Sequence, residues 1–263
     1  MRDHKTLLCY DLRQLLSRKA ERERNSWFLL PKSALFHNSN RMDALMSTEV
    51  LDAPATDLHS RKQLIREQAH ANRNAQPDKD EISRRIVASF MAQPEYAAAR
   101  TVMFYVDVRS EVRTRNDLAV ALETGKKIVV PYCVDGELEL FHLESMDELE
   151  LGMYRILEPR ADLRPVEAKR VAVEKLDLIM VPGVGFDRRG GRTGHGKGYY
   201  DKLLEHARPD TPLIALAFEC QLFPEIPMQS HDMFMDKVVT EAAVYEGLGR
   251  RGDAESSAPS KPR

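Results

Sequence analysis

The sequence is 263 residues long, with 30% charged residues and a formal net charge of −2. That length can bury a full-sized core in one domain or at most two. The small net charge excludes a global field that would hold nucleic acid or an anionic membrane, so any anion must be recognised by a local cluster. No run reaches the roughly 18 apolar residues of a membrane-spanning helix. We therefore expect neither a nucleic acid nor a membrane as a partner.

Three cysteines stand far apart in the chain: Cys9, Cys133 and Cys220. They form neither a CxxC pair nor a disulfide framework, which indicates a reducing compartment. The arginine-rich start has the charge of a transit peptide, but it also carries acidic residues, which such peptides avoid. We therefore expect a cytoplasmic protein.

Both ends of the chain lack the periodicity of packed structure. Residues 1–56 mix charge with scattered apolar residues, and residues 247–263 are rich in glycine, serine, proline and charge. Such segments bury too little apolar surface to offset the entropy of ordering them. We expect a disordered N-terminal extension, a disordered tail and a single domain over residues 57–246.

The middle of the chain alternates helical and extended patterns. Ser60 can cap a first helix that ends near Asn74, and a second helix is expected from Asp80 to Met91, ahead of Pro94. Two more helical patterns cover residues 115–123 and 199–207. Short apolar runs predict six strands, at residues 101–106, 128–131, 138–141, 176–181, 213–218 and 237–240.

Buried strands that alternate with helices predict an α/β fold. We expect a three-layer, single-domain architecture, in which a mostly parallel sheet carries helices on both faces. Ligands in such sheets bind beyond the carboxyl ends of the strands. The loops after Val106, Val181 and Phe218 are therefore the candidate positions for a site.

The most informative segment runs from Val181 to Asp201, between a predicted strand and a predicted helix. Three glycines alternate within it: Gly194, Gly196 and Gly198. Alternate glycines let the backbone adopt turns that other residues avoid, so that N–H groups can approach an anion. Arg192 can hold phosphate oxygens bidentately, and Lys197 adds a point charge. The pattern favours a phosphate-binding loop over a flexible surface loop with incidental charges.

Two common phosphate loops do not fit the segment. Residues 191–197 match the first part of a Walker A loop, but Gly198 stands where a serine or threonine would bind Mg²⁺. The dinucleotide fingerprint fails because Tyr199 stands where a third glycine is required. The segment is therefore a phosphate loop of another kind.

This segment resembles the stretch PGxxFDxxGxRxGxGxGYYD of the 5-formyltetrahydrofolate cyclo-ligase family, with Pro182 to Asp201 matching almost throughout. The resemblance extends over about residues 62–240. Three shorter matches accompany it: Lys62 with Arg66, Ser110-Glu111-Val112, and His231 to Thr240. Two positions depart from the pattern, Thr193 where an apolar residue is common and His195 where arginine or a larger side chain often stands.

The resemblance implies a cyclo-ligase-like catalytic domain over residues 57–246. Its implied activity is the ATP-dependent conversion of 5-formyltetrahydrofolate to 5,10-methenyltetrahydrofolate, with release of ADP and phosphate. The implied mechanism phosphorylates the formyl oxygen to give an iminophosphate, which N10 then attacks. The enzyme would contribute positioning and charge stabilisation, as in other phosphoryl transfers. ATP, Mg²⁺ and a reduced folate are the implied ligands, and a monomer is favoured.

The resemblance also assigns the nucleotide residues. Arg192, Lys197 and Tyr199 are the implied catalytic residues. ATP would be bound by Lys62, Arg66, Gly191, Arg192, Thr193, Gly194, His195, Gly196, Lys197 and Gly198. Lys62 and Arg66 stand four residues apart and therefore share a helix face. The alternative for this pair is a solvated basic face.

Because Gly198 offers no hydroxyl, Mg²⁺ would depend on carboxylates, which a hard cation prefers. Asp201 and Asp232 are the matching positions. The alternatives are an ordinary carboxylate in the first helical turn for Asp201 and a turn residue for Asp232.

A folate site needs apolar or aromatic walls and an acceptor for the pterin N–H groups. The implied residues are Val106, Glu111, Tyr154, Tyr199 and Tyr200. Glu111 would accept from the pterin, and Tyr154 would face the benzoyl part. Val106 fits core packing equally well.

Two other function classes fit parts of the pattern. A sugar-phosphate isomerase would also need an anion loop, but it would require a general base and no ATP. A non-catalytic folate-binding protein would keep the pocket without the cations and carboxylates of catalysis.

We predict that the first 45 residues are dispensable, because they show no periodicity and the resemblance starts only near Lys62. Met42 and Met46 are available as internal starts. A chain that begins at Met46 should melt and turn over like the full-length protein, as measured by thermal denaturation and steady-state kinetics. A melting temperature lowered by several degrees would instead identify a packed arm, for which Trp27 to Leu30 is the candidate contact.

Overall fold

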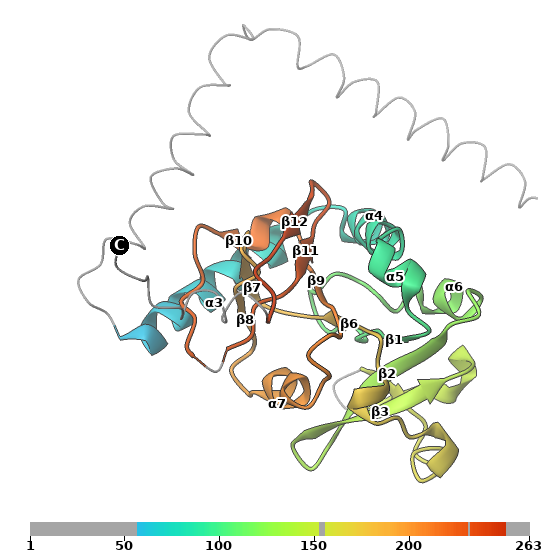
Figure 1. Cartoon of the computed structure of the whole chain (residues 1–263). Helices are drawn as coiled ribbons and strands as arrows, with labels where there is room; N and C mark the ends of the chain where they lie inside the picture. Colours follow the sequence, from blue (N-terminus) through green and yellow to red (C-terminus); the bar gives the residue numbers. More distant parts are fainter. Residues whose placement is uncertain (1–56, 153–155, 231, 251–263) are drawn as a thin grey trace, which may run out of the picture. The chain divides into compact units, whose positions relative to one another are not determined.

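A seven-stranded sheet forms the centre of the described structure, a computed structural model in which residues 57–152, 156–230 and 232–250 are described (Figure 1). Its strand order is β12-β11-β9-β6-β1-β2-β3. The five inner strands are parallel, and each edge strand pairs antiparallel with its neighbour. The strands are β1 (Thr101–Met103), β2 (Lys127–Val134), β3 (Glu137–Leu143), β6 (Leu178–Val181), β9 (Leu213–Leu216), β11 (Lys237–Val239) and β12 (Val244–Glu246).

Successive residues of each inner strand enter two different core clusters, because side chains alternate across a sheet. In β6, Leu178 and Met180 belong to one cluster, and Ile179 and Val181 to the other. All four side chains are fully buried. Burial on both faces explains why the inner strands appear in the sequence as continuous apolar runs.

Helices cover these clusters. The first cluster receives side chains from α4 (Lys79–Met91) and α6 (Leu118–Leu122), and the second from α7 (Tyr199–Glu205). A further helix, α3 (Leu58–Ala75), contacts a smaller sheet and the turn η5 (Glu219–Gln221) instead. The smaller sheet has the order β10-β7-β8, formed by β7 (Gly185–Asp187), β8 (Arg192–Thr193) and β10 (Leu222–Phe223). No helix among the described residues could cross a bilayer.

The α/β fold and the mostly parallel sheet are confirmed, and all six predicted strands are present. The three-layer and single-domain parts of the expectation stay predictions. The predicted cap at Ser60 is wrong, because α3 already begins at Leu58 and Ser60 lies in its first turn. A short helix that was not predicted, α5 (Pro94–Ala98), begins at Pro94. Proline is well suited to the first position of a helix.

Several short elements were not expected from the sequence. They are β7, β8, β10, β12 and the antiparallel pair β4 (Leu149–Leu151) with β5 (Leu157–Pro159). These strands have two or three residues each and lie outside the long apolar runs by which the six other strands were predicted.

The contact between α3 and the small sheet is closely packed. A Cβ at Gly185 would lie 3.1 Å from Ile65, 3.2 Å from Phe223 and 3.3 Å from Thr193. Thr193 is buried there, and among the described residues its hydroxyl has no hydrogen-bond partner. A buried polar group without a partner lowers stability.

We predict that Thr193→Val stabilises the protein by about 1 kcal/mol, because it removes an unsatisfied hydroxyl from an apolar contact. Thr211→Val is the matched control, since the buried Thr211 hydroxyl donates to the Leu176 carbonyl at 3.0 Å. The control should lower the unfolding free energy. Chemical denaturation measures both, and an equal loss in the two variants would contradict the prediction.

Candidate functional site

The three loops named from the sequence meet in the structure, and α3 contacts all of them. Arg73 of α3 donates to the Ser110 hydroxyl after β1 (3.0 Å) and to the Gly183 carbonyl after β6 (3.2 Å). Asn72 donates to the Cys220 carbonyl after β9 at 3.0 Å. Because β1, β6 and β9 are adjacent parallel strands, the loops that follow them lie at the same edge of the sheet. Side chains of α3 form hydrogen bonds to all three loops.

Asp187 determines the shape of the first half of the glycine-rich segment. This fully buried carboxylate accepts N–H groups from Arg189 (2.9 Å) and Gly191 (2.8 Å) through Oδ1 and from Ile226 (2.8 Å) through Oδ2. A Cβ at Gly191 would overlap the Asp187 carboxylate, so glycine there leaves room for this turn. Sequence reasoning gave Asp187 no role, although an aspartate ahead of a Gly-Gly pair is a turn signal.

The second half of the segment holds the alternate glycines. Gly196 and Gly198 have φ of +85° and +72°, values that favour glycine. Gly198 is the N-cap residue of α7, directly before the first helical residue, Tyr199. Residues 195–197 are exposed. This part of the loop, which follows β8, is therefore accessible to solvent.

Residues of α3 contact this loop. The Arg66 Nε donates to the Gly194 carbonyl at 2.9 Å. Lys62 is buried and forms an ion pair with Asp232. The solvated basic face that the spacing also allowed is therefore wrong, because one residue of the pair is buried and the other bonds to the loop.

Each predicted metal carboxylate is paired with a predicted nucleotide cation. Arg192, whose side chain is 6% exposed, pairs with Asp201 and also donates to the Pro182 carbonyl at 3.3 Å. Asp232 pairs with Lys62, and its carboxylate also accepts the Gln229 N–H at 2.7 Å, so it closes a local turn as well. Asp201 lies in the first turn of α7 and is half exposed.

Lys197 remains exposed and lies 5.9 Å from the centre of the Tyr199 ring. Among the described residues, no group of three or more acidic, histidine or cysteine side chains is arranged to hold a metal ion. The oxygen donors of Asp201 and Asp232 suit Mg²⁺ chemically, but their ion pairs would have to open for it.

Glu111 joins the loop after β1 to the glycine-rich loop. Its Oε1 lies 3.2 Å from His195 Nε2 and 4.0 Å from Arg73 Nη1, and its Oε2 accepts the Val108 N–H at 3.0 Å. The His195 ring lies 5.3 Å from the His70 ring. A residue assigned to ATP and a residue assigned to folate are thus neighbours.

Arg73 and His70 complete this cluster, and the sequence analysis named neither. The Arg73 guanidinium lies 3.4 Å from His70 Nδ1. Because a guanidinium only donates, Nδ1 accepts and the proton of the neutral ring is on Nε2. Burial and then the charge of Arg73 lower the pKa of His70, so its ring is neutral at physiological pH.

The remaining folate candidates lie in different environments. Tyr200 is half buried, and burial followed by the charge of Glu111 raises the pKa of its hydroxyl, which therefore stays protonated. Val106 packs against the first core cluster, as its alternative interpretation expected. Tyr154 lies outside the described residues, as does His231 of the late motif.

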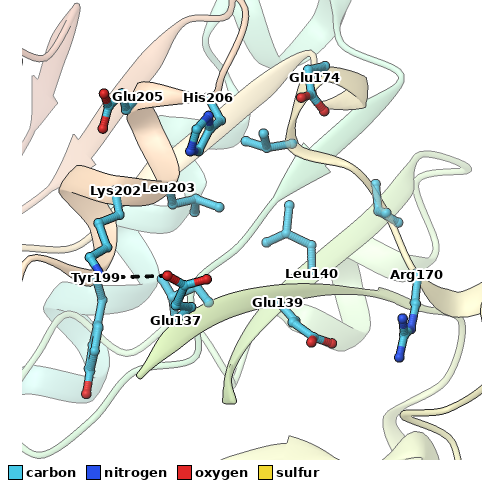
Figure 2. A pocket seen from close by; sticks show the side chains of 13 residues that line it. Glu137, Glu139, Leu140, Arg170, Glu174, Tyr199, Lys202, Leu203, Glu205 and His206 are labelled. Atoms are coloured by element: carbon cyan, nitrogen blue, oxygen red, sulfur yellow. Dashed lines mark ion pairs between the residues drawn. The ribbon is translucent and has the colours of Figure 1, made fainter. Parts of the chain in front are cut away.

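A cavity of about 450 Å³ lies between β3 and α7 (Figure 2). Its lining includes Tyr199 but none of the other predicted nucleotide or folate residues. Apolar side chains form part of the wall, at Leu138, Leu140, Val171, Val173 and Leu203. Charged side chains of both signs surround them, including the Lys202–Glu137 pair at 3.6 Å.

The sequence model of the 5-formyltetrahydrofolate cyclo-ligase family matches residues 58–241. The probable 5-formyltetrahydrofolate cyclo-ligase of Schizosaccharomyces pombe is 31% identical over 169 residues, which cover 59% of this chain and 81% of that protein. The 5-formyltetrahydrofolate cyclo-ligase of Escherichia coli K12 is 28% identical, covering 63% of this chain and 91% of that protein.

Solved structures agree with the sequence comparison. The NMR structure of Aquifex aeolicus 5,10-methenyltetrahydrofolate synthetase superposes with a TM-score of 0.61 at 30% identity, covering 70% of this chain and 92% of that one. The synthetase of Mycoplasma pneumoniae shares the fold with a TM-score of 0.53 at 19% identity. The family match covers more than half of the chain, and the chain is therefore a member of the 5-formyltetrahydrofolate cyclo-ligase family of enzymes.

Proposed function

We propose that this protein uses ATP to cyclise 5-formyltetrahydrofolate to 5,10-methenyltetrahydrofolate, releasing ADP and phosphate through an iminophosphate. One observation carries the proposal beyond family membership. His195 of the phosphate loop lies 3.2 Å from Glu111, the carboxylate assigned to the pterin. Phosphoryl transfer requires the phosphate donor and the acceptor to be held together, and this contact supports the proposal that the nucleotide and folate sites are adjacent.

The proposed chemistry solves a leaving-group problem. The oxygen of a formamide leaves poorly, so the γ-phosphoryl group is first transferred to it and ADP departs. N10 then attacks the formyl carbon, a C–N bond forms, the C–O bond breaks, and phosphate leaves with the former formyl oxygen. The N10 proton passes to solvent. Stabilising charge on the transferred group is the main task of the protein.

The loop residues would meet that task. Backbone N–H groups around the three alternate glycines would face the phosphate oxygens, and Arg192 and Lys197 would neutralise their charge. Tyr199 follows directly and would contact the reacting groups. Lys62 and Arg66 would reach the same nucleotide from α3. Both Lys62 and Arg192 are paired with aspartates, so nucleotide binding would exchange those partners.

Asp201 and Asp232 would hold Mg²⁺ once their cation partners turn to phosphate. The ion supplies charge neutralisation for the β- and γ-phosphates. The geometry supports this exchange because each aspartate already lies beside a predicted nucleotide residue.

Glu111 would accept hydrogen bonds from the pterin, with Tyr199, Tyr200, Tyr154 and Val106 as walls. The neutral hydroxyl of Tyr200 suits a wall that contacts an uncharged ring.

We propose further that the protein acts as a cytoplasmic monomer with the catalytic domain at residues 57–246.

Absorbance of the methenyl chromophore tests the proposal directly. The protein should generate it from 5-formyltetrahydrofolate only with Mg-ATP, with one ADP formed per product. A non-catalytic folate-binding protein would bind the folate without ATP turnover, and a sugar-phosphate isomerase would act without ATP. Absence of the chromophore under these conditions would refute the proposal.

Lys197→Ala should reduce kcat by about 100-fold, because one preorganised electrostatic contact contributes about 3 kcal/mol to the transition state. Lys175→Ala removes another exposed lysine, outside the loop, and should turn over like the wild type. Steady-state kinetics with ATP as the varied substrate measures both. A wild-type kcat/KM in Lys197→Ala would remove this residue from catalysis.

Asp201→Asn should raise the Mg²⁺ concentration needed for half-maximal activity by about 10-fold or more, because an amide replaces an anionic ligand of a hard cation. Folate affinity should be nearly unchanged. The control Asp210→Asn changes an exposed aspartate that pairs with Arg208. If the Mg²⁺ titrations of both variants coincide with the wild type, the ion is bound elsewhere.

A further inference from the structure

The side chain of Glu111 is covered by other protein groups. Its side chain is only 6% exposed. Oε2 accepts the Val108 N–H at 3.0 Å, while Oε1 faces His195 at 3.2 Å and Arg73 at 4.0 Å. A pterin that binds this carboxylate would therefore displace groups that now surround it.

Of these three partners, His195 is the least constrained by burial and by other contacts. Arg73 is fully buried and fixed by Ser110 and Gly183, and the Val108 donor is backbone. The His195 side chain is 38% exposed. It also stands between two glycines, of which Gly196 has φ of +85°. Glycines lower the barrier to rearranging the backbone on either side of the imidazole.

We propose that the contact between His195 and Glu111 masks this carboxylate, and that a nucleotide on the phosphate loop draws His195 away. The nucleotide would thereby raise the affinity of the protein for the reduced folate. This inference rests on the proposed function, because it requires Glu111 to receive the folate and the loop to receive ATP.

When His195 moves from Glu111 to the phosphate, each hydrogen bond that is lost is replaced by another. To donate to Oε1, Nε2 of His195 carries a proton whether the ring is neutral or charged. A phosphate on the loop offers that N–H an alternative anionic acceptor, and charge-assisted bonds of this kind are strong. The carboxylate oxygen left behind then accepts from the pterin. Without the nucleotide, the folate must break the His195 bond with no replacement for it.

His70 keeps His195 in the masking position without repelling it. The two rings lie 5.3 Å apart and are tilted by 33°. Arg73 donates to His70 Nδ1 at 3.4 Å, which fixes the tautomer of the neutral ring. Burial and Arg73 lower the pKa of His70, so it adds no positive charge beside His195. The contact of His195 with Glu111 is therefore accompanied by a ring contact with an uncharged neighbour.

Calorimetric titration of 5-formyltetrahydrofolate tests the mask without turnover. For the wild type, a non-hydrolysable Mg-ATP analogue should tighten folate binding by about 10-fold, within the usual range for coupled sites. In His195→Ala the folate should bind about 10-fold more tightly than to the wild type without the analogue, and the analogue should add less than about 2-fold.

His195→Gln separates masking from a general disturbance of the loop. Its amide can still donate to Glu111, so folate binding without the analogue should stay at the wild-type level. His206→Ala removes an exposed histidine at the end of α7 and should leave the wild-type coupling in place. Circular dichroism verifies that each variant is folded.

These titrations distinguish a failure of the masking proposal from a failure of the proposed function. If wild-type protein binds the folate equally well with and without the analogue, or if His195→Ala keeps the full coupling, the mask is wrong while the proposed function stands. If the wild type binds neither ligand, both the proposed function and the mask are wrong.

Discussion

The buried guanidinium of Arg73 is the interaction on which the site depends. It is fully buried on α3, donates to Ser110 and Gly183, and lies 4.0 Å from the carboxylate of Glu111. Burial lowers the pKa of Arg73, and the charge of Glu111 opposes that shift. A buried charge is tolerated only when its hydrogen-bonding capacity is used. Any rearrangement that separates these segments would leave a buried cation unpaired, so the helix and two loops must be placed together.

Around this fixed point, ionic groups of the candidate site are paired with one another. Lys62 pairs with Asp232, Arg192 with Asp201, and His195 contacts Glu111. In each case a residue assigned to the nucleotide meets one assigned to the metal or the folate. Ligand binding would then replace existing partners instead of burying new charge. Such exchange makes the ligands interdependent, because each frees a group that another requires.

The sheet explains why these particular loops meet. β1 and β6 are parallel neighbours, and β9 pairs with β6 on its other side. Their carboxyl ends therefore open at the same edge, which is where ligands bind in open α/β sheets. The small sheet then folds the glycine-rich segment back against α3, and Asp187 holds that turn by accepting three N–H groups.

The sequence by itself determined the α/β pattern, the six predicted strands, the four predicted helices and the glycine-rich loop that follows β6. These features depend on local periodicity and on glycine, and both are visible within a few residues. The sequence did not reveal the cap of α3, the helix at Pro94, the strands β7, β8, β10 and β12, or the β4–β5 pair. Packing and long-range pairing outweigh local preference at these positions. The roles of the site residues remain predictions, though their neighbours are now known.

Only the tertiary structure decided which groups meet. Lys62 finds Asp232 across 170 residues, Arg66 finds Gly194 across 128, and His195 finds Glu111 across 84. No spacing in the sequence encodes such pairs, since each depends on how α3 lies across the loop ends. For the same reason the sequence did not reveal the role of Arg73. In the sequence it is one arginine of a polar helix, whereas in the structure it is the most deeply buried charged residue of α3.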